Sequence, residues 1–174
     1  MAVTLINGKN MLLFARLYKD RTEMAATKIR FQTEHSIDMG TESDSTVTKD
    51  GTMQSITDGD NTVDMSSLAY NDDEETIFGW RYLRDEGFKK KELVELWQVD
   101  LDSLNEGQYD VDYFQGYLTS FNLSAPADGN VTLDYTYAIN GIGARGTDTV
   151  DIEAVQQALY DYQVMAPATD TPEV

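Results

Sequence analysis

A run of strict alternation between apolar and polar side chains, at residues 131–139, constrains the fold of this sequence more than any other feature. Its apolar members are Val131, Leu133, Tyr135, Tyr137 and Ile139. Successive side chains of a strand point to opposite faces, so the run predicts a strand with one buried and one solvent-facing side. Such alternation is typical of antiparallel sheets, because parallel strands are usually buried on both faces. The sequence therefore predicts a mainly β, antiparallel protein.

Shorter patterns predict further strands. Residues 11–18 are apolar on both faces, which predicts a strand that is central or covered on both sides. Residues 28–32, 93–101 and 117–123 also alternate. Near Gly116 the apolar phase slips by one residue, which predicts a bulge at that glycine.

Polar segments lie between these strands. The Asp50-Gly51 and Asp128-Gly129 pairs favour hairpin turns, because glycine tolerates a positive φ. Segments 46–55 and 61–68 are polar and rich in β-branched residues. They are therefore expected to form long hairpin arms or solvent-facing edge strands rather than core.

One α-helix is expected at about residues 72–86, beside the sheet. Asp72 and Glu75 have capping-box spacing, apolar residues follow, and Gly87 is expected to end the helix. A second, short helix is expected over 152–162, followed by an acidic flexible tail. The expected organisation is one β domain over residues 1–150 and a C-terminal extension over 151–174.

Charge restricts the partners of the chain. It has 13 Lys and Arg against 31 Asp and Glu, a net charge of −18, which disfavours free-standing nucleic-acid binding and docking to anionic membranes. No apolar run is long enough to span a bilayer and no secretion signal opens the sequence, so a soluble, unsecreted protein is expected. The charge is +1 over residues 1–49, −5 over 50–91 and −14 over 92–174. A chain with a basic front and an acidic rear can attract its own copies, unless folding mixes the blocks.

Common catalytic and metal chemistries have little support. The chain has no cysteine and a single histidine, His35, without a nearby G-x-S-x-G motif. Glycines 141, 143 and 146 meet the G-x-G-x-x-G spacing, but the strand before them alternates like an antiparallel one, which favours a flexible glycine-rich strand end over a nucleotide site.

The acidic segment 58–64 departs from the EF-hand pattern at Val63 and Ala69, so an acidic turn is favoured over a metal site. No catalytic residue, metal or cofactor is predicted, and the protein is not expected to be an enzyme.

Several segments resemble the major tail protein, or tail tube protein, family of siphophages that infect Gram-positive hosts, of the lactococcal type. The similarity runs from Gly8 to about Gly146. The segments that carry it are residues 11–18, Thr48-Lys49-Asp50-Gly51-Thr52 ahead of 62–68, 92–100, 116–126 and 128–132.

This resemblance implies a β-sandwich or partial barrel with one flanking helix. It also implies six copies in a ring, and rings stacked into the hollow tail tube of the virion, through which the genome passes. The implied partners are other copies of the chain, the tape-measure protein and the tail terminator and distal tail proteins, with assembly in the host cytoplasm.

Two sites follow as hypotheses. A hairpin at Thr48, Lys49, Asp50, Gly51 and Thr52 would contribute to the tube wall. A basic set would reach acidic groups on the next ring: Arg16, Lys19, Arg21, Lys28 and Arg30. An acidic lumen would repel DNA phosphates.

Three alternatives remain at this point. A carbohydrate- or calcium-binding β-sandwich module would also be acidic and aromatic. Another virion protein of the same fold would share the strand pattern. An acidic hydrolase would need a pocket that the sequence does not mark.

Overall fold

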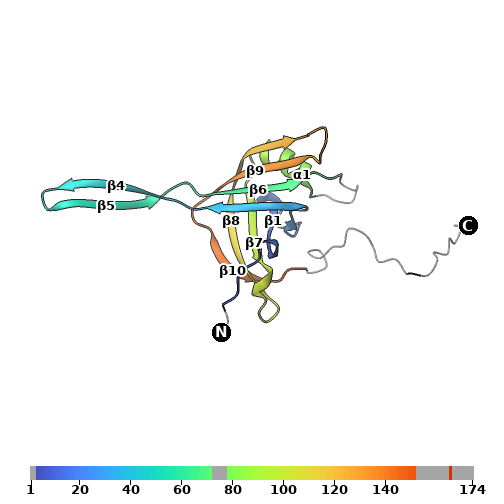
Figure 1. The fold of residues 1–174 in the computed structure, drawn as a ribbon, viewed down its shortest axis with the longest axis horizontal. Helices are drawn as coiled ribbons and strands as arrows, with labels where there is room; N and C mark the ends of the chain where they lie inside the picture. The colour runs from blue at the N-terminus through green and yellow to red at the C-terminus, as the bar shows by residue number, and fades with distance from the viewer. Residues whose placement is uncertain (1–2, 72–77, 152–164, 166–174) are drawn as a thin grey trace, which may run out of the picture.

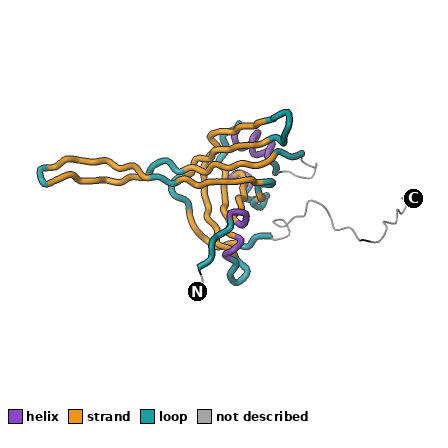
Figure 2. Tube along the Cα trace, viewed as in Figure 1, coloured by secondary structure: helices purple, strands orange, loops and turns teal. Residues whose placement is uncertain are grey.

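The computed structural model describes residues 3–71, 78–151 and 165. The first part of the expected helix at 72–86 and the expected helix at 152–162 therefore lie outside the described residues. In the described part, one curved sheet forms the body of the molecule, and a separate two-stranded hairpin projects from it (Figures 1 and 2).

The body is an eight-stranded antiparallel sheet, as the alternation predicted. Its path runs β2-β1-β7-β8-β9-β6-β3, and β10 pairs with β8. Because β9 and β10 pair with different halves of the long strand β8, they share one of its edges. The strands are β1 (Met11–Leu17), β2 (Thr27–Lys28), β3 (Gln32–Asp38), β6 (Thr62–Leu68), β7 (Val94–Asp100), β8 (Tyr109–Ser124), β9 (Thr132–Ile139) and β10 (Ala144–Asp148).

The sheet curls until its two ends meet. The Gln32 side chain, at the start of β3, accepts a hydrogen bond from the Leu13 backbone N–H at 3.0 Å and donates to the Leu13 carbonyl at 2.9 Å. Farther along β3, the His35 ring nitrogen lies 2.8 Å from the Gln98 side-chain oxygen on β7. Since β3 ends the strand order on one side and β1 lies next to the terminal strand β2 on the other, these contacts close the sheet into the partial barrel that was expected.

The inside of the curl holds the main apolar core. It draws on β1, β6, β7, β8 and β9, and its side chains with the lowest exposure include Leu13, Leu96 and Tyr137. Leu13, Ala15 and Leu17 of β1 face this core, while Phe14 faces a second, smaller cluster with Val99, Tyr109 and Val111. The prediction that residues 11–18 are covered on both sides is confirmed.

One flanking helix is confirmed, but the prediction that it is continuous over about 72–86 is wrong, because Phe78 and Gly79 are not helical and the described helix begins at Trp80. Helix α1 (Trp80–Tyr82) follows the extended residue Gly79 and continues as a π-helical turn, Leu83–Phe88. The helix therefore ends one residue beyond the expected stop at Gly87. Gly87 lies inside the helix and packs closely on the core, since a Cβ there would be 3.3 Å from the Leu17 side chain.

The bulge predicted for β8 is not at Gly116, and a register shift of that kind lies farther along the strand. Pairing with β7 continues without a shift to Gly116, and the irregularity against β9 lies between Leu118 and Ser120. The phase slip arises because β8 first buries Val111 in the smaller cluster and then Phe114 in the main core, on its other face. Glycine is needed at 116 for space, since a Cβ would lie 1.9 Å from the Ala138 carbonyl oxygen.

Two further strand expectations need correction. Residues 61–68 were expected to be an arm or an edge, but β6 lies between β9 and β3 and buries Val63, Met65 and Ser67. Residues 28–32 do not form one strand, because Phe31 has a φ of 55° and separates β2 from β3.

Candidate functional site

The projecting hairpin, here called the arm, consists of β4 (Thr41–Thr48) and β5 (Gly51–Asp58) (Figure 1). Every residue of both strands is exposed, so the arm has no core of its own. The hairpin expected around 46–55 is confirmed. Its tip holds the residues predicted for the tube wall, with Gly51 at a φ of 130° and the Thr48 hydroxyl donating to the Gly51 carbonyl at 2.6 Å.

The two faces of the arm differ in chemistry. The register pairs Val47 with Thr52 and Ser43 with Ile56, so Val47 and Ile56 share one face, where they are 81% and 68% exposed. Glu42 and Asp44 lie on the opposite face. A two-stranded hairpin is at best marginally stable alone in water, and exposed apolar side chains favour contact with another molecule. The Val47 face is therefore a candidate contact surface.

A second candidate surface, here called the acidic face, is the outer side of the β3-β6-β9-β8 part of the sheet. Register alone places its residues, because cross-strand partners share a face. Apart from Leu68, Ala138 and Tyr117, it consists of small polar side chains and the carboxylates of Glu34, Asp38, Asp64 and Asp134. No lysine or arginine occurs within these four strands as described.

Hydroxyl groups hold two of these carboxylates along the acidic face. Asp134 accepts a hydrogen bond from Ser66 at 2.5 Å, and Asp64 accepts one from Thr136 at 2.8 Å. Both bonds cross from β6 to β9. The sequence reasoning missed this face because no local motif marks it, although the polar positions of residues 131–139 were a partial signal.

The basic residues predicted for contacts between rings do not form one patch. Arg16, Lys28 and Arg30 line a hollow of about 760 Å³ whose apolar wall includes Trp97. Arg16 is already used within the chain, because its Nε donates to the buried Glu95 carboxylate at 2.8 Å and its guanidinium lies over the Trp97 ring.

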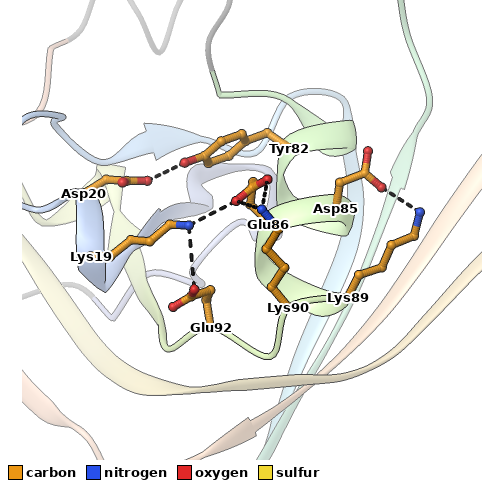
Figure 3. A network of polar contacts seen from close by, with 8 residues as sticks. All are labelled: Lys19, Asp20, Tyr82, Asp85, Glu86, Lys89, Lys90 and Glu92. Carbon is orange, nitrogen blue, oxygen red and sulfur yellow. Dashed lines mark hydrogen bonds and ion pairs between the residues drawn. The ribbon is translucent and has the colours of Figure 1, made fainter.

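Lys19 lies elsewhere, in a polar network between the segment after β1 and the helix (Figure 3). Its ammonium group is 3.0 Å from the Glu86 carboxylate and 3.7 Å from that of Glu92. The hydrogen bond with Glu86 raises the pKa of Lys19. Hydrogen bonds from Lys90 and Lys19 lower the pKa of Glu86. The nearby Tyr82 hydroxyl donates to Asp20 at 2.5 Å.

Arg21 packs its guanidinium over the Tyr18 ring, 4.1 Å from the centroid, and donates to the Tyr18 carbonyl at 2.9 Å. The five basic residues thus fall into three environments, with Arg16, Lys28 and Arg30 together at the hollow and Lys19 and Arg21 elsewhere, and their role between rings stays a prediction.

The glycine-rich motif is no nucleotide site: its first two glycines lie in the turn between β9 and β10, and Gly146 lies within β10. Gly141 and Gly143 have φ values of 69° and 78° and connect the antiparallel neighbours of β8, so no parallel βαβ unit exists there. Within residues 3–71 and 78–151, no three His, Cys, Asp or Glu side chains gather into a candidate metal site. Among the helices described, none has the length and apolar character to span a membrane.

Comparison with known proteins now identifies the fold and the function. The family described as phage tail tube protein matches residues 5–144, which include every strand of the body and the arm except the last residues of β10. The chain belongs to the phage tail tube protein family. A protein of Staphylococcus phage phiMR25 that is named as a tail protein is 27% identical over 158 residues, 88% of this chain and 77% of that protein.

Solved structures agree on the fold of this tail tube family member. The SPP1 tail tube subunit matches with a TM-score of 0.70 at 14% identity, over 97% of this chain and 96% of that one. The tail of a gene transfer agent particle, refined with C6 symmetry, matches with a TM-score of 0.56 at 15% identity, over 80% and 98%. A sheath/tube terminator of an extracellular contractile injection system matches with a TM-score of 0.53 at 7% identity, over 86% and 100%.

Family membership therefore gives the chain a structural role in the phage virion, as part of the tail. Membership of this family supports the tail tube interpretation over the carbohydrate- or calcium-binding module and over the acidic hydrolase.

Proposed function

We propose that six copies of this protein close into a ring, and that rings stack into the hollow tube through which the phage genome passes. The observation that carries this proposal is the tail tube family match over residues 5–144. The C6 symmetry of the gene transfer agent tail, which shares the fold, supports six as the number of copies. In this proposal the protein forms the wall of the tube and carries out no enzymatic reaction.

The acidic face lines the bore in this arrangement. Its carboxylates, on Glu34, Asp38, Asp64 and Asp134, repel DNA phosphates, so the genome slides past the wall without binding. Closing the ring pairs sheet edges from neighbouring copies. Within the described chain, β3 pairs only with β6, and β10 only with β8, so each has an edge available for a second copy.

The arm contacts a neighbouring copy through its Val47 and Ile56 face. Burying these side chains offsets the weak intrinsic stability of the hairpin, and the carboxylates of Glu42 and Asp44 stay on the solvent side. The tape-measure protein and the tail terminator and distal tail proteins are the remaining partners. Assembly takes place in the host cytoplasm.

Electron microscopy of the purified chain tests the assembly. Negative-stain images are expected to show rings or tubes with sixfold symmetry in cross-section. The double variant Val47→Ser/Ile56→Ser is expected to keep the folded body but to lose most tubes, because the apolar contact of the arm is removed.

The matched control is Met53→Ser, on the opposite face of the arm and 64% exposed. It is expected to assemble like the parent chain. Rings of another symmetry would overturn the sixfold proposal, and normal tubes from the double variant would overturn the role of the arm.

A further inference from the structure

The base of the arm contains a buried asparagine that joins three separate segments. Asn61 follows β5 and is only 7% exposed, in an acidic loop whose neighbour Asp60 is exposed. Its side-chain oxygen accepts a hydrogen bond from the Gly40 N–H at 3.1 Å, and its side-chain nitrogen donates to the Gly141 carbonyl at 2.7 Å. Its backbone carbonyl accepts from the Ile139 N–H at 2.9 Å.

These partners lie on both sides of the junction between arm and body. Gly40 is the residue before β4, while Ile139 ends β9 and Gly141 belongs to the turn that leads to β10. A single side chain therefore ties the residue before the first strand of the arm to the turn that follows β9 in the body sheet. A buried amide that loses one of these partners leaves a polar group unsatisfied, which favours one geometry over its alternatives.

Two other features indicate that the junction between the arm and the body is a hinge. The Gly59 N–H donates to the Gly40 carbonyl at 3.0 Å. This backbone hydrogen bond joins the two segments that connect the body to the arm, one before β4 and one after β5. A Cβ on Gly59 would lie 3.0 Å from the Gly40 oxygen and 3.1 Å from its carbonyl carbon, so the chains approach closely only because residue 59 is glycine. A hollow of about 540 Å³ beside the junction leaves room for the arm to change direction.

We propose that Asn61 is a positioning residue that sets the direction of the arm before assembly, so that the Val47 face meets the neighbouring copy. Fixing the direction in the free chain lowers the conformational entropy that assembly must otherwise remove. The inference rests on the proposed function, in which the arm contacts a second copy.

Pulsed EPR on the full chain measures the arm direction without reference to assembly. The chain has no cysteine, so labels at Lys49→Cys and Asp128→Cys report the distance from the arm tip to the β8–β9 turn in protein kept unassembled by dilution. The parent chain is expected to give one narrow distance distribution. Asn61→Ala is expected to broaden it, with about a tenfold rise in the population outside the main distance.

Asn61→Asp keeps the acceptor for Gly40 but cannot donate to Gly141, so an intermediate broadening is expected. Gly59→Ala leaves Asn61 in place and is expected to shift the main distance through its clash with the Gly40 backbone. Asp60→Ala, in the same loop, is the control and should match the parent chain. Circular dichroism of each variant verifies that the body is folded.

A parent-like distribution in Asn61→Ala would overturn the proposal. A broadened distribution with a parent-like rate of tube formation would overturn the link between arm direction and assembly. The Val47→Ser/Ile56→Ser variant separates this inference from the proposed function, because it should lose tubes while it keeps the narrow distribution.

Discussion

The body and the arm are both antiparallel β-structure, but only the body has an interior. Strands of the body bury Leu13, Leu96 and Tyr137 almost completely, whereas every strand residue of the arm is exposed. Backbone pairing is continuous along the arm and along β7 and β8 of the body. The difference shows that hydrogen-bonded pairing defines a strand locally, while burial decides whether that strand stabilises its own chain or is available to another one.

The largest expected difference between the body and the arm is in the free energy of unfolding that is lost when an apolar side chain is truncated. Leu96→Ala removes a completely buried side chain from the centre of β7 and is expected to lower the free energy of unfolding by about 2–5 kcal/mol. Ile56→Ala, a similar truncation in the arm, is expected to change it by less than about 0.5 kcal/mol. Urea unfolding of the unassembled protein measures both values. Equal losses would mean that the arm shares the core of the body.

Removal of a positively charged side chain is expected to have a smaller effect on the free energy of unfolding. Arg16→Met leaves Glu95 buried beside the Tyr113 hydroxyl without its cationic partner, and is expected to cost about 1–3 kcal/mol because the pair is partly open to solvent. Lys19→Met, in the exposed network of Figure 3, is expected to cost less, and its effect should shrink as salt is added. A cost for Lys19→Met equal to that for Arg16→Met would contradict the burial argument.

Tyrosine ionisation has the smallest expected effect on stability near neutral pH. This effect concerns only the body. Burial raises the pKa of Tyr137, whose hydroxyl donates to the Val94 carbonyl at 2.8 Å. The neutral form is favoured in the folded state, so this stability is complete below the unfolded pKa of about 10 and is lost as pH rises above it. Thermal unfolding should therefore shift to lower temperature above that pH.

Tyr137→Phe is expected to lose about 1 kcal/mol near neutral pH with its hydrogen bond, but to show a weaker alkaline decline. Tyr117→Phe, at an exposed position of β8, is the control and should keep the parent slope. An unchanged slope in Tyr137→Phe would show that other groups control alkaline unfolding.

Local patterns predicted much of the body. Alternation over residues 131–139 located β9 and its buried side, and the apolar run at 11–18 located a strand covered on both faces. The failures have a common cause. Residues 61–68 look polar, yet Val63 and Met65 are enough to fill the core side of β6 once β9 and β3 lie beside it. Near Gly116, a change of buried face had the same sequence signature as a bulge.

The candidate surfaces were less accessible to prediction. The tip of the arm was found from Thr48 to Thr52, because Asp-Gly turn chemistry is local. The acidic face was not, because Glu34, Asp64 and Asp134 come from three strands and meet only through their register. The five basic residues looked alike in the sequence, but burial and partners give Arg16 and Lys19 different surroundings.

By itself, the sequence determined the class of this protein: antiparallel β, acidic, without cysteine, and similar to phage tail tube proteins. Such properties depend on composition and on patterns between near neighbours, which no tertiary contact alters. Only the tertiary structure decided which carboxylates share a face, which cations are already paired and how Asn61 joins the arm to the body. Those properties depend on contacts between residues far apart in the chain, and strand order and register create them.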